Sequence, residues 1–343
     1  MKALVLRGPG TAFEMVEVPD PVAAPGEAVA RVLACGAGLT IQHVKAGRIA
    51  ARFPRIIGHE ITGEIVAVGA GVSGLSIGDG VTAYFYLNCG YCRSCLANLE
   101  PLCENTGGNV GINCDGGYAQ YIKLPAHVFI RLPAGIDYRA HPAEIGVVTD
   151  ALATPYKVLR RARVKAGETV AVFGAGGGLG IHQVMMAKWA KARVIAVDTA
   201  RGKLDACRKA GADELVAASG DEAVQALLDL TRGRGVDVVV DYVSTTSTLE
   251  TGARALGRRG RLVTLGGAGK PFQVSSLDLL LKEQELLGSR YVTRSEILDT
   301  LDLVARKEVW PMVTEIVRLE EAEALHERIE RGEVIGRAAL RIG

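Results

Sequence analysis

TVAVFGAGGGLGIHQ, residues 169–183, is the stretch that decides the fold of the second half of this chain. TVAVF predicts a short buried strand, a cluster of glycines follows, and the apolar run after the cluster predicts a helix. Glycines at such a junction permit a tight turn and a close approach of the backbone to a pyrophosphate, to which the helix N-terminus offers amide donors. The spacing is nearer to G-x-x-G-x-x-G than to G-x-G-x-x-G, so a purely structural turn remains an alternative. The candidate cofactor-binding residues are Gly174, Gly176, Gly177, Gly178, Leu179 and Gly180.

The alternation of strand and helix continues along the chain from this turn. Each further strand is almost entirely apolar, which predicts a parallel sheet buried on both faces by helices. The predicted strands are 193–198, 214–219, 236–243 and 261–267, and the predicted helices are 179–192, 200–212, one from Asp221 and one from about residue 246. Residues 151–290 are therefore predicted to form a doubly wound, Rossmann-type α/β domain.

Asp198 ends the second predicted strand of this domain, 18 residues after Gly180. An acidic residue in that position hydrogen-bonds ribose hydroxyls and repels a 2′-phosphate, which favours NAD over NADP. A solvated aspartate at a strand end is the alternative interpretation. Arg201 and Lys203 follow closely in the sequence and weaken the exclusion of NADP.

The first 145 residues are rich in Gly, Pro and Val and contain short alternating runs, such as 27–34 and 64–69. Such runs predict the half-buried strands of an antiparallel, barrel-like domain. The tail after about residue 290 returns to mixed elements and is expected to rejoin this domain. The predicted division is therefore 1–150 with 291–343, and 151–290.

The bulk composition is that of an ordinary globular protein, with 48% hydrophobic and 23% charged residues among 343. A net charge of +2 gives no indication of a nucleic-acid or anionic-membrane partner. No apolar run reaches 18 residues, and MKALVLRGPG at the start lacks the apolar core of a signal peptide. These features together predict a cytoplasmic location and no membrane association.

Four of the seven cysteines are crowded into CGYCRSCLANLEPLC, residues 89–103. Two C-x-x-C steps and a further cysteine can place four thiolates around one tetrahedral ion, which describes a structural zinc site without an open position. An iron–sulfur cluster also uses four cysteines and is the alternative. The candidate ligands are Cys89, Cys92, Cys95 and Cys103, in a lobe of about 88–104.

The order of these motifs, with GHE at 58–60 before the cysteine lobe and the glycine turn, resembles the zinc-containing medium-chain dehydrogenase/reductase family of alcohol dehydrogenase type. The resemblance extends over essentially the whole chain. It implies a GroES-like catalytic domain, a Rossmann domain and a substrate cleft between them. It also implies NAD(H), one structural zinc ion, a small-molecule substrate and a homodimer or homotetramer.

The same resemblance implies a catalytic zinc held by Cys, His and Cys or Asp, with a Glu nearby. PRIIGHEITG supplies His59 and Glu60, and VVTDALATPY supplies Asp150. In ACGAGLTIQHV (34–44), however, Gly38 stands at the position of the ligand cysteine and Ile41 at that of a supporting aspartate. Because outer residues matter nearly as much as ligands, we expect this zinc site to be degraded or absent. Weak zinc binding by the remaining residues, or by Cys35 after a loop shift, is the alternative.

Further residues receive a role from the resemblance alone. Thr40 and His43 match the proton relay, with His59, Glu60 and Asp150 completing the catalytic set. The cofactor contacts so implied are Thr154, Val243, Gly266 and Arg337, the last toward the pyrophosphate. Thr154 as a helix N-cap, Arg337 as a solvated strand residue, and Val243 and Gly266 as ordinary strand ends are the structural alternatives.

These residues predict an NAD(H)-dependent oxidoreductase that interconverts an alcohol and a ketone or aldehyde by hydride transfer. Metal-independent reduction of a conjugated C=C bond, in an enone or enoyl-CoA, is one alternative. A catalytically silent nucleotide-binding protein is another. The loop 45–55 favours an anionic or CoA-linked substrate unless it is simply a solvated basic loop, and its cations are Lys45, Arg48, Arg52 and Arg55.

Overall fold

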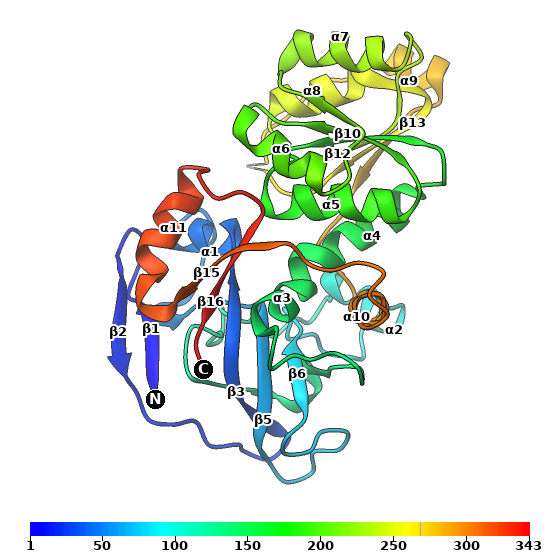
Figure 1. Ribbon diagram of the computed structural model, residues 1–343. Helices are drawn as coiled ribbons and strands as arrows, with labels where there is room; N and C mark the ends of the chain where they lie inside the picture. Colours follow the sequence, from blue (N-terminus) through cyan, green and yellow to red (C-terminus); the bar gives the residue numbers. More distant parts are fainter. Residues whose placement is uncertain (268) are drawn as a thin grey trace. The chain divides into compact units, whose positions relative to one another are not determined.

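The chain folds into two compact units in the computed structural model, which describes residues 1–267 and 269–343 (Figure 1). Unit 1 comprises Met1–Ala151 and Val292–Gly343, and unit 2 comprises Leu152–Tyr291. Unit 1 is β-rich and unit 2 contains a parallel sheet between helices, so the predicted fold class is confirmed. Within the described part of the chain, no helix is long and apolar enough to span a membrane.

A six-stranded parallel sheet forms the centre of unit 2, in the order β11-β10-β9-β12-β13-β14. Its strands are β9 (Thr169–Phe173), β10 (Arg193–Val197), β11 (Glu214–Val216), β12 (Val236–Asp241), β13 (Leu256–Thr264) and β14 (Glu285–Gly288). The chain runs outward from β9 in one direction and resumes at β12 in the other. Doubly wound sheets bind ligands at the carboxyl end of such a reversal.

Helices pack against this sheet because its strands are apolar on both faces. All five residues of β9 are buried, and one apolar cluster joins Phe173 and Ile195 of the sheet to Leu227 and Leu249 of two helices. The helices are α4 (Ala153–Ala162), α5 (Gly178–Trp189), α6 (Arg201–Lys209), α7 (Gly220–Leu230), α8 (Thr246–Ala255) and α9 (Ser276–Lys282).

Strand β9 lies where the sequence predicts it, whereas β13 begins five residues before the predicted residue 261. The added segment, LGRRG, has no apolar pattern, but Leu256 pairs with Val236 before an irregularity in the register. Pairing with β12 therefore determines where β13 begins, and the local sequence does not predict this start.

Unit 1 is built on the eleven-residue strand β3, which pairs with β5, β7 and β16. The larger sheet has the order β15-β16-β3-β5-β6-β8 and a smaller one the order β2-β1-β4. The strands are β1 (Lys2–Leu6), β2 (Phe13–Glu17), β3 (Glu27–Ala37), β4 (Arg55–Ile56), β5 (Ile61–Val68), β6 (Gly80–Ala83), β7 (Tyr121–Pro125), β8 (Phe129–Arg131), β15 (Val313–Arg318) and β16 (Arg337–Arg341). Because β16 pairs with β3, the tail of the chain rejoins the first domain, as the sequence predicts.

Short helices border these sheets. They are α1 (Leu39–Lys45), α2 (Arg93–Leu96), α3 (Pro142–Val147), α10 (Arg294–Ala305) and α11 (Ala322–Glu330), with the turns η1 (Glu100–Leu102), η2 (Ala126–Val128), η3 (Val148–Leu152) and η4 (Leu319–Glu321). The turn η3 is π-helical and contains Asp150. Single π-turns in helical segments are frequent at functional sites.

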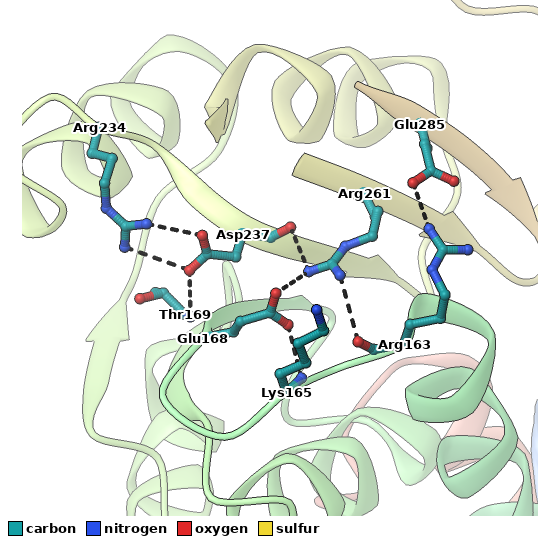
Figure 2. A network of polar contacts seen from close by, with 8 residues as sticks. All are labelled: Arg163, Lys165, Glu168, Thr169, Arg234, Asp237, Arg261 and Glu285. Atoms are coloured by element: carbon teal, nitrogen blue, oxygen red, sulfur yellow. Dashed lines mark hydrogen bonds and ion pairs between the residues drawn. The ribbon is translucent and has the colours of Figure 1, made fainter. Parts of the chain in front are cut away.

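A polar network ties the amino-terminal part of the parallel sheet together, away from the glycine turn (Figure 2). The Arg261 guanidinium lies 2.7 Å from Glu168 and also donates to the carbonyl oxygens of Arg163 and Asp237. The Arg261 side chain is only 8% exposed, so these acceptors satisfy a guanidinium that is almost completely buried. By contrast, the pair of Arg163 and Glu285 is about half exposed.

Replacing Arg261 by Met should lower the free energy of unfolding by about 2 kcal/mol, because it removes a buried charged donor from a carboxylate and two carbonyls. Glu285→Gln, in the exposed pair of the same network, should cost less than about 1 kcal/mol. Urea unfolding of both variants measures the difference. Equal losses would show that burial does not set the strength of this network.

Candidate functional site

The glycine turn after β9 requires glycine at two positions. Gly174 has φ +69°, and a Cβ atom there would lie 2.8 Å from Cγ2 of Val243. At Gly180, in the first turn of α5, a Cβ would lie 2.7 Å from the Cα of Ala175. The turn and the first helical turn therefore fit together only without side chains, at the reversal between β9 and β12.

The N-terminus of α5 has the features of an anion site. Its N-cap, Gly177, has no side chain to accept the first amides, and the first helical hydrogen bond is from Ile181 N–H to Gly177 O, at 3.0 Å. The amides of Gly178, Leu179 and Gly180 precede that bond and have no intrahelical acceptor. Free amides and the positive end of the helix dipole suit a pyrophosphate, so this chain's residues fit the dinucleotide that the sequence predicts.

Asp198 follows β10 and joins it to the glycine turn. Its Oδ2 accepts the N–H of Gly176 at 2.9 Å, and its Oδ1 accepts the N–H of Ala200 at 2.9 Å. The carboxylate is thus held at the edge of the sheet where the turn begins. Its predicted contact with ribose remains a prediction.

The other predicted cofactor contacts of unit 2 lie in different places. Val243 follows β12, is 42% exposed and lies next to Gly174, whereas Gly266 follows β13 with φ +120°. Thr154 is buried inside α4, whose N-cap is Leu152, so the interpretation of Thr154 as an N-cap is wrong. A nicotinamide contact for these residues remains a prediction.

The cysteine lobe of unit 1 gathers its four sulfurs into one cluster. The Sγ atoms of Cys89, Cys92, Cys95 and Cys103 all lie within 4.8 Å of one another. The distances Cys89–Cys95 and Cys92–Cys103 are 3.9 Å, close to the roughly 3.8 Å that tetrahedral Zn–S bonds of about 2.3 Å produce. Backbone amides donate to three of the sulfurs. The cluster therefore fits a single closed metal site.

A buried group of charges occupies the other predicted metal position. Arg337 Nη2 lies 2.6 Å from Glu60 Oε2, and Arg337 Nε donates to the same oxygen at 2.9 Å. Arg337 Nη2 is 3.7 Å from Asp150 Oδ2, which is itself 3.5 Å from His59 Nε2. All four side chains are at most 9% exposed. The interpretation of Arg337 as a solvated strand residue is therefore wrong.

Arg337 also fills the space beside Gly38. A Cβ atom on Gly38 would lie 2.5 Å from Cζ and Nη2 of Arg337, and closer still to Nη1. Within the described residues, the four-cysteine cluster is the group assembled to hold a metal, and His59, Glu60 and Asp150 do not form a second one. With Arg337 in this position, the residues do not fit a catalytic zinc ion.

Cys35 does not replace the missing ligand. It is fully buried in β3, and Cβ atoms added to Gly58 and Gly117 would lie 2.8 and 3.1 Å from its Sγ. Burial raises the pKa of this thiol well above its ordinary range, and the nearby Glu60 carboxylate adds to the effect. Cys35 is therefore a packed, protonated thiol of the core.

The same burial acts on Glu60, whose pKa is raised chiefly by desolvation. The Arg337 guanidinium opposes this shift, and the neighbouring Asp150 adds to it. The space for Glu60 also comes from a glycine, because a Cβ on Gly36 would lie 2.8 Å from the Cβ of Glu60. The Arg337 guanidinium is thus the main group that favours the ionised form of Glu60, with a smaller contribution from His59.

Thr40 and His43 lie on α1, and both are partly buried. Burial lowers the pKa of His43, and the positive charge of Arg48 lowers it further, so the imidazole is neutral at pH 7. Its Nδ1 is buried without a hydrogen-bond partner among the described residues. A neutral imidazole on this helix is a competent proton acceptor.

The basic loop does not present four free cations. Arg48 makes two hydrogen bonds of 2.7 Å to Glu330, Arg55 lies 2.8 Å from Asp115, and Lys45 pairs with Glu323. Arg52 is exposed, and its side chain has no polar partner among the described residues. Anion binding here would compete with acids of the chain itself, which weakens the predicted anchor.

The role of Arg337 is the feature that sequence reasoning missed. Its partner Glu60 is 277 residues away, so no local pattern joins them. A signal exists in CGAG (35–38), where Gly36 lies inside β3 and Gly38 follows it. Glycine within a strand often marks the close approach of another group. Here the groups are the carboxylate of Glu60 and the guanidinium of Arg337.

Two family descriptions match the chain: "Alcohol dehydrogenase GroES-like domain" over residues 24–134 and "Zinc-binding dehydrogenase" over residues 178–306. An alcohol dehydrogenase of Geobacillus stearothermophilus is 33% identical, over 100% of this chain and 99% of the relative. An acryloyl-coenzyme A reductase of Metallosphaera sedula is 31% identical, over 99% of each chain. Among solved structures, an NAD-dependent alcohol dehydrogenase is 28% identical with a TM-score of 0.91, over 100% of each chain.

The chain therefore belongs to the zinc-type medium-chain dehydrogenase/reductase family, and the resemblance found in its sequence is confirmed. It is an oxidoreductase of that family, with a GroES-like unit and a Rossmann-type unit.

Replacing Cys103 by Ser should reduce bound zinc from about one ion per chain to almost none, because three thiolates and a hydroxyl hold zinc far less tightly than four thiolates. Elemental mass spectrometry of the purified protein measures this. Cys114→Ser, outside the cluster, should leave the zinc content unchanged. Full zinc content in the Cys103 variant would contradict the assignment of the cluster.

Proposed function

We propose that the protein is an NAD(H)-dependent oxidoreductase that interconverts an alcohol and a ketone or aldehyde by hydride transfer, with a structural zinc ion and no catalytic zinc ion. The observation that carries the proposal is the retained set of His59, Glu60 and Asp150 in unit 1, built around a guanidinium instead of a metal. Thr40 and His43 on α1 complete the proposed proton path.

The choice of cofactor rests on unit 2. The open amides of α5 and the glycines of the turn support binding of a pyrophosphate, and the carboxylate of Asp198 at the end of β10 supports NAD over NADP. Relatives named as NAD-dependent alcohol dehydrogenases also support this cofactor. The nicotinamide supplies the hydride chemistry when it is bound.

The chain's own residues transfer the proton of the alcohol hydroxyl. In alcohol oxidation the hydroxyl proton must leave as the carbonyl forms, and neutral His43 accepts it through the hydroxyl of Thr40. In the opposite direction the same two groups return a proton to the oxygen. Because the pKa of His43 is lowered, its imidazole stays unprotonated, and able to accept a proton, at pH values below the ordinary histidine pKa of 6.5.

Reduction of a conjugated C=C bond is the second candidate, and the position of Arg337 favours it. A conjugated carbonyl spreads the charge that follows hydride addition and has less need of a Lewis acid. The acryloyl-coenzyme A reductase relatives support this candidate as well. A catalytically silent nucleotide-binding protein is the remaining alternative.

We further propose a cytoplasmic protein, because four of its seven cysteines are gathered in a metal-binding arrangement, and clustered cysteines of this kind are typical of a reducing compartment. The family resemblance supports a homodimer or homotetramer acting on a small molecule.

The proposal is tested by steady-state kinetics on secondary alcohols, ketones, enones and enoyl thioesters with NAD⁺ or NADH. We expect turnover of an alcohol–ketone pair, and His43→Gln should lower kcat by about 100-fold because it removes the proton acceptor. Turnover of enones or enoyl thioesters alone would select the second candidate. NADH binding without any turnover would identify the silent alternative.

The pH profile of the same reaction provides a further check. Oxidation should weaken as the pH falls through the lowered pKa of His43, because the protonated imidazole cannot accept a proton. Arg48→Gln removes the charge that lowers this pKa, so the acidic limb should move to higher pH. An acidic limb of the pH profile that stays the same in the His43→Gln and Arg48→Gln variants would contradict the role of His43.

Asp198→Asn removes the charge beside the proposed ribose site while keeping a side-chain oxygen that accepts hydrogen bonds. The ratio of kcat/KM for NADP to that for NAD should rise by about tenfold, because one repulsive charge pair disappears. Asp205→Asn, an exposed acid on α6, should leave the ratio unchanged. An unchanged ratio in the Asp198 variant would remove this residue from cofactor selection.

A further inference from the structure

Gly38 is a glycine because of space, not because of its backbone conformation. Its φ of −144° and ψ of 175° are extended values that any residue adopts. A Cβ atom, however, would lie 2.5 Å from Cζ and Nη2 of Arg337. Any side chain at this position requires the guanidinium of Arg337 to shift from its place beside Gly38. The family resemblance implies a ligand cysteine at position 38, and the guanidinium of Arg337 fills the space that the side chain of this cysteine would occupy.

Charge holds the guanidinium in that space. Two buried carboxylates face it, Glu60 at 2.6 Å and Asp150 at 3.7 Å from Nη2. Buried anions are strongly destabilising without a nearby cation. Arginine suits this task because its charge is permanent and its planar donors can serve one carboxylate with two nitrogens, as Nε and Nη2 serve Glu60.

The cluster extends from the guanidinium to the imidazole of His59. Asp150 Oδ2 lies between Arg337 and His59, 3.5 Å from the imidazole Nε2. His59 also packs on Phe85, with 4.7 Å between ring centres. His59 is therefore in contact with both Asp150 and Phe85, and Asp150 lies within ion-pair distance of Arg337.

We propose that Arg337 is the permanent cation of this centre, in the place of a metal ion. The missing side chain at Gly38 leaves the space that allows arginine, rather than zinc, to occupy the centre. Arg337 acts as a positioning residue: it holds Glu60 and Asp150, and through Asp150 it holds His59. The inference rests on the proposed function for the part that this centre takes in turnover. Its tests measure unfolding and bound zinc, so it can fail while the proposed activity stands, and the reverse.

The first test is a double-mutant cycle on the unfolding midpoint. Arg337→Met should lower the midpoint by roughly 10 °C, because it leaves Glu60 and Asp150 without their cation. Adding Glu60→Gln should recover a substantial part of this loss, and Arg337→Lys should lose less than Arg337→Met. A cation explains such rescue, whereas simple packing predicts additive losses. Additive losses would overturn the proposal.

Arg328→Met is the matched control in the same unit. Arg328 makes two hydrogen bonds to Glu315, at 2.7 and 2.8 Å, but its side chain is 40% exposed. The control should change the midpoint by no more than about 2 °C, because exposed ion pairs contribute little. A control loss as large as that of Arg337→Met would also count against the proposal.

Gly38→Ala tests the space directly and does not depend on recovering the Arg337→Met protein in high yield. In the wild-type background the added methyl group should lower the unfolding midpoint, because it displaces the guanidinium. In the Arg337→Lys background the loss should be smaller, because a lysine has no planar head group to displace. Equal losses in both backgrounds would contradict the contact.

Zinc content tests the exchange of cation. After incubation with zinc and dialysis, the wild-type protein should hold about one zinc ion per chain, at the four cysteines. The double variant Gly38→Cys with Arg337→Met should hold about two, because it restores a thiolate beside His59 and Asp150 and removes the competing cation. Two ions in the wild-type protein, or one in both proteins, would overturn the proposal.

Discussion

The ion pair between Arg337 and Glu60 is the interaction on which the arrangement of the catalytic unit depends. It joins the first residue of β16 to the segment before β5, across 277 residues. It places a positive charge among two carboxylates and an imidazole that are almost completely buried. Without that charge, the two buried acids would be costly enough to disturb the local structure.

This interaction also changes what the centre can do. A zinc ion polarises a carbonyl oxygen as a Lewis acid, whereas a guanidinium offers charge and hydrogen-bond donors only. The chemistry left to the chain is therefore positioning and proton transfer, with the hydride supplied by the cofactor. Such a centre suits substrates that stabilise their own developing charge, or reactions in which a base such as His43 carries the proton.

The fold was largely predictable from the sequence, because its signals are local. The apolar run 169–173, the glycines after it and the strand–helix alternation up to β12 are each visible within a short window. The start of β13 was not predictable, because it depends on pairing with β12 through a polar segment.

The candidate site divides in the same way. The close spacing of four cysteines in the sequence predicts that they form a cluster, and in the structure their sulfurs lie together. The glycine at position 38 indicates that a ligand is missing, but not what fills its place. The answer depends on the path of the Arg337 side chain, which is set by the pairing of β16 with β3 and by a distant buried carboxylate. The only local trace of this long-range compensation is the pair of glycines in CGAG (35–38), which does not identify the group that approaches them.

Anomalous diffraction at the zinc absorption edge, from crystals grown with zinc present, tests the central claim most directly. One strong peak per chain should lie among Cys89, Cys92, Cys95 and Cys103, with continuous density for the Arg337 guanidinium beside Gly38 and no peak between His59 and Asp150. A second peak at His59 and Asp150, with Arg337 displaced from Glu60, would show that the centre remains a zinc site.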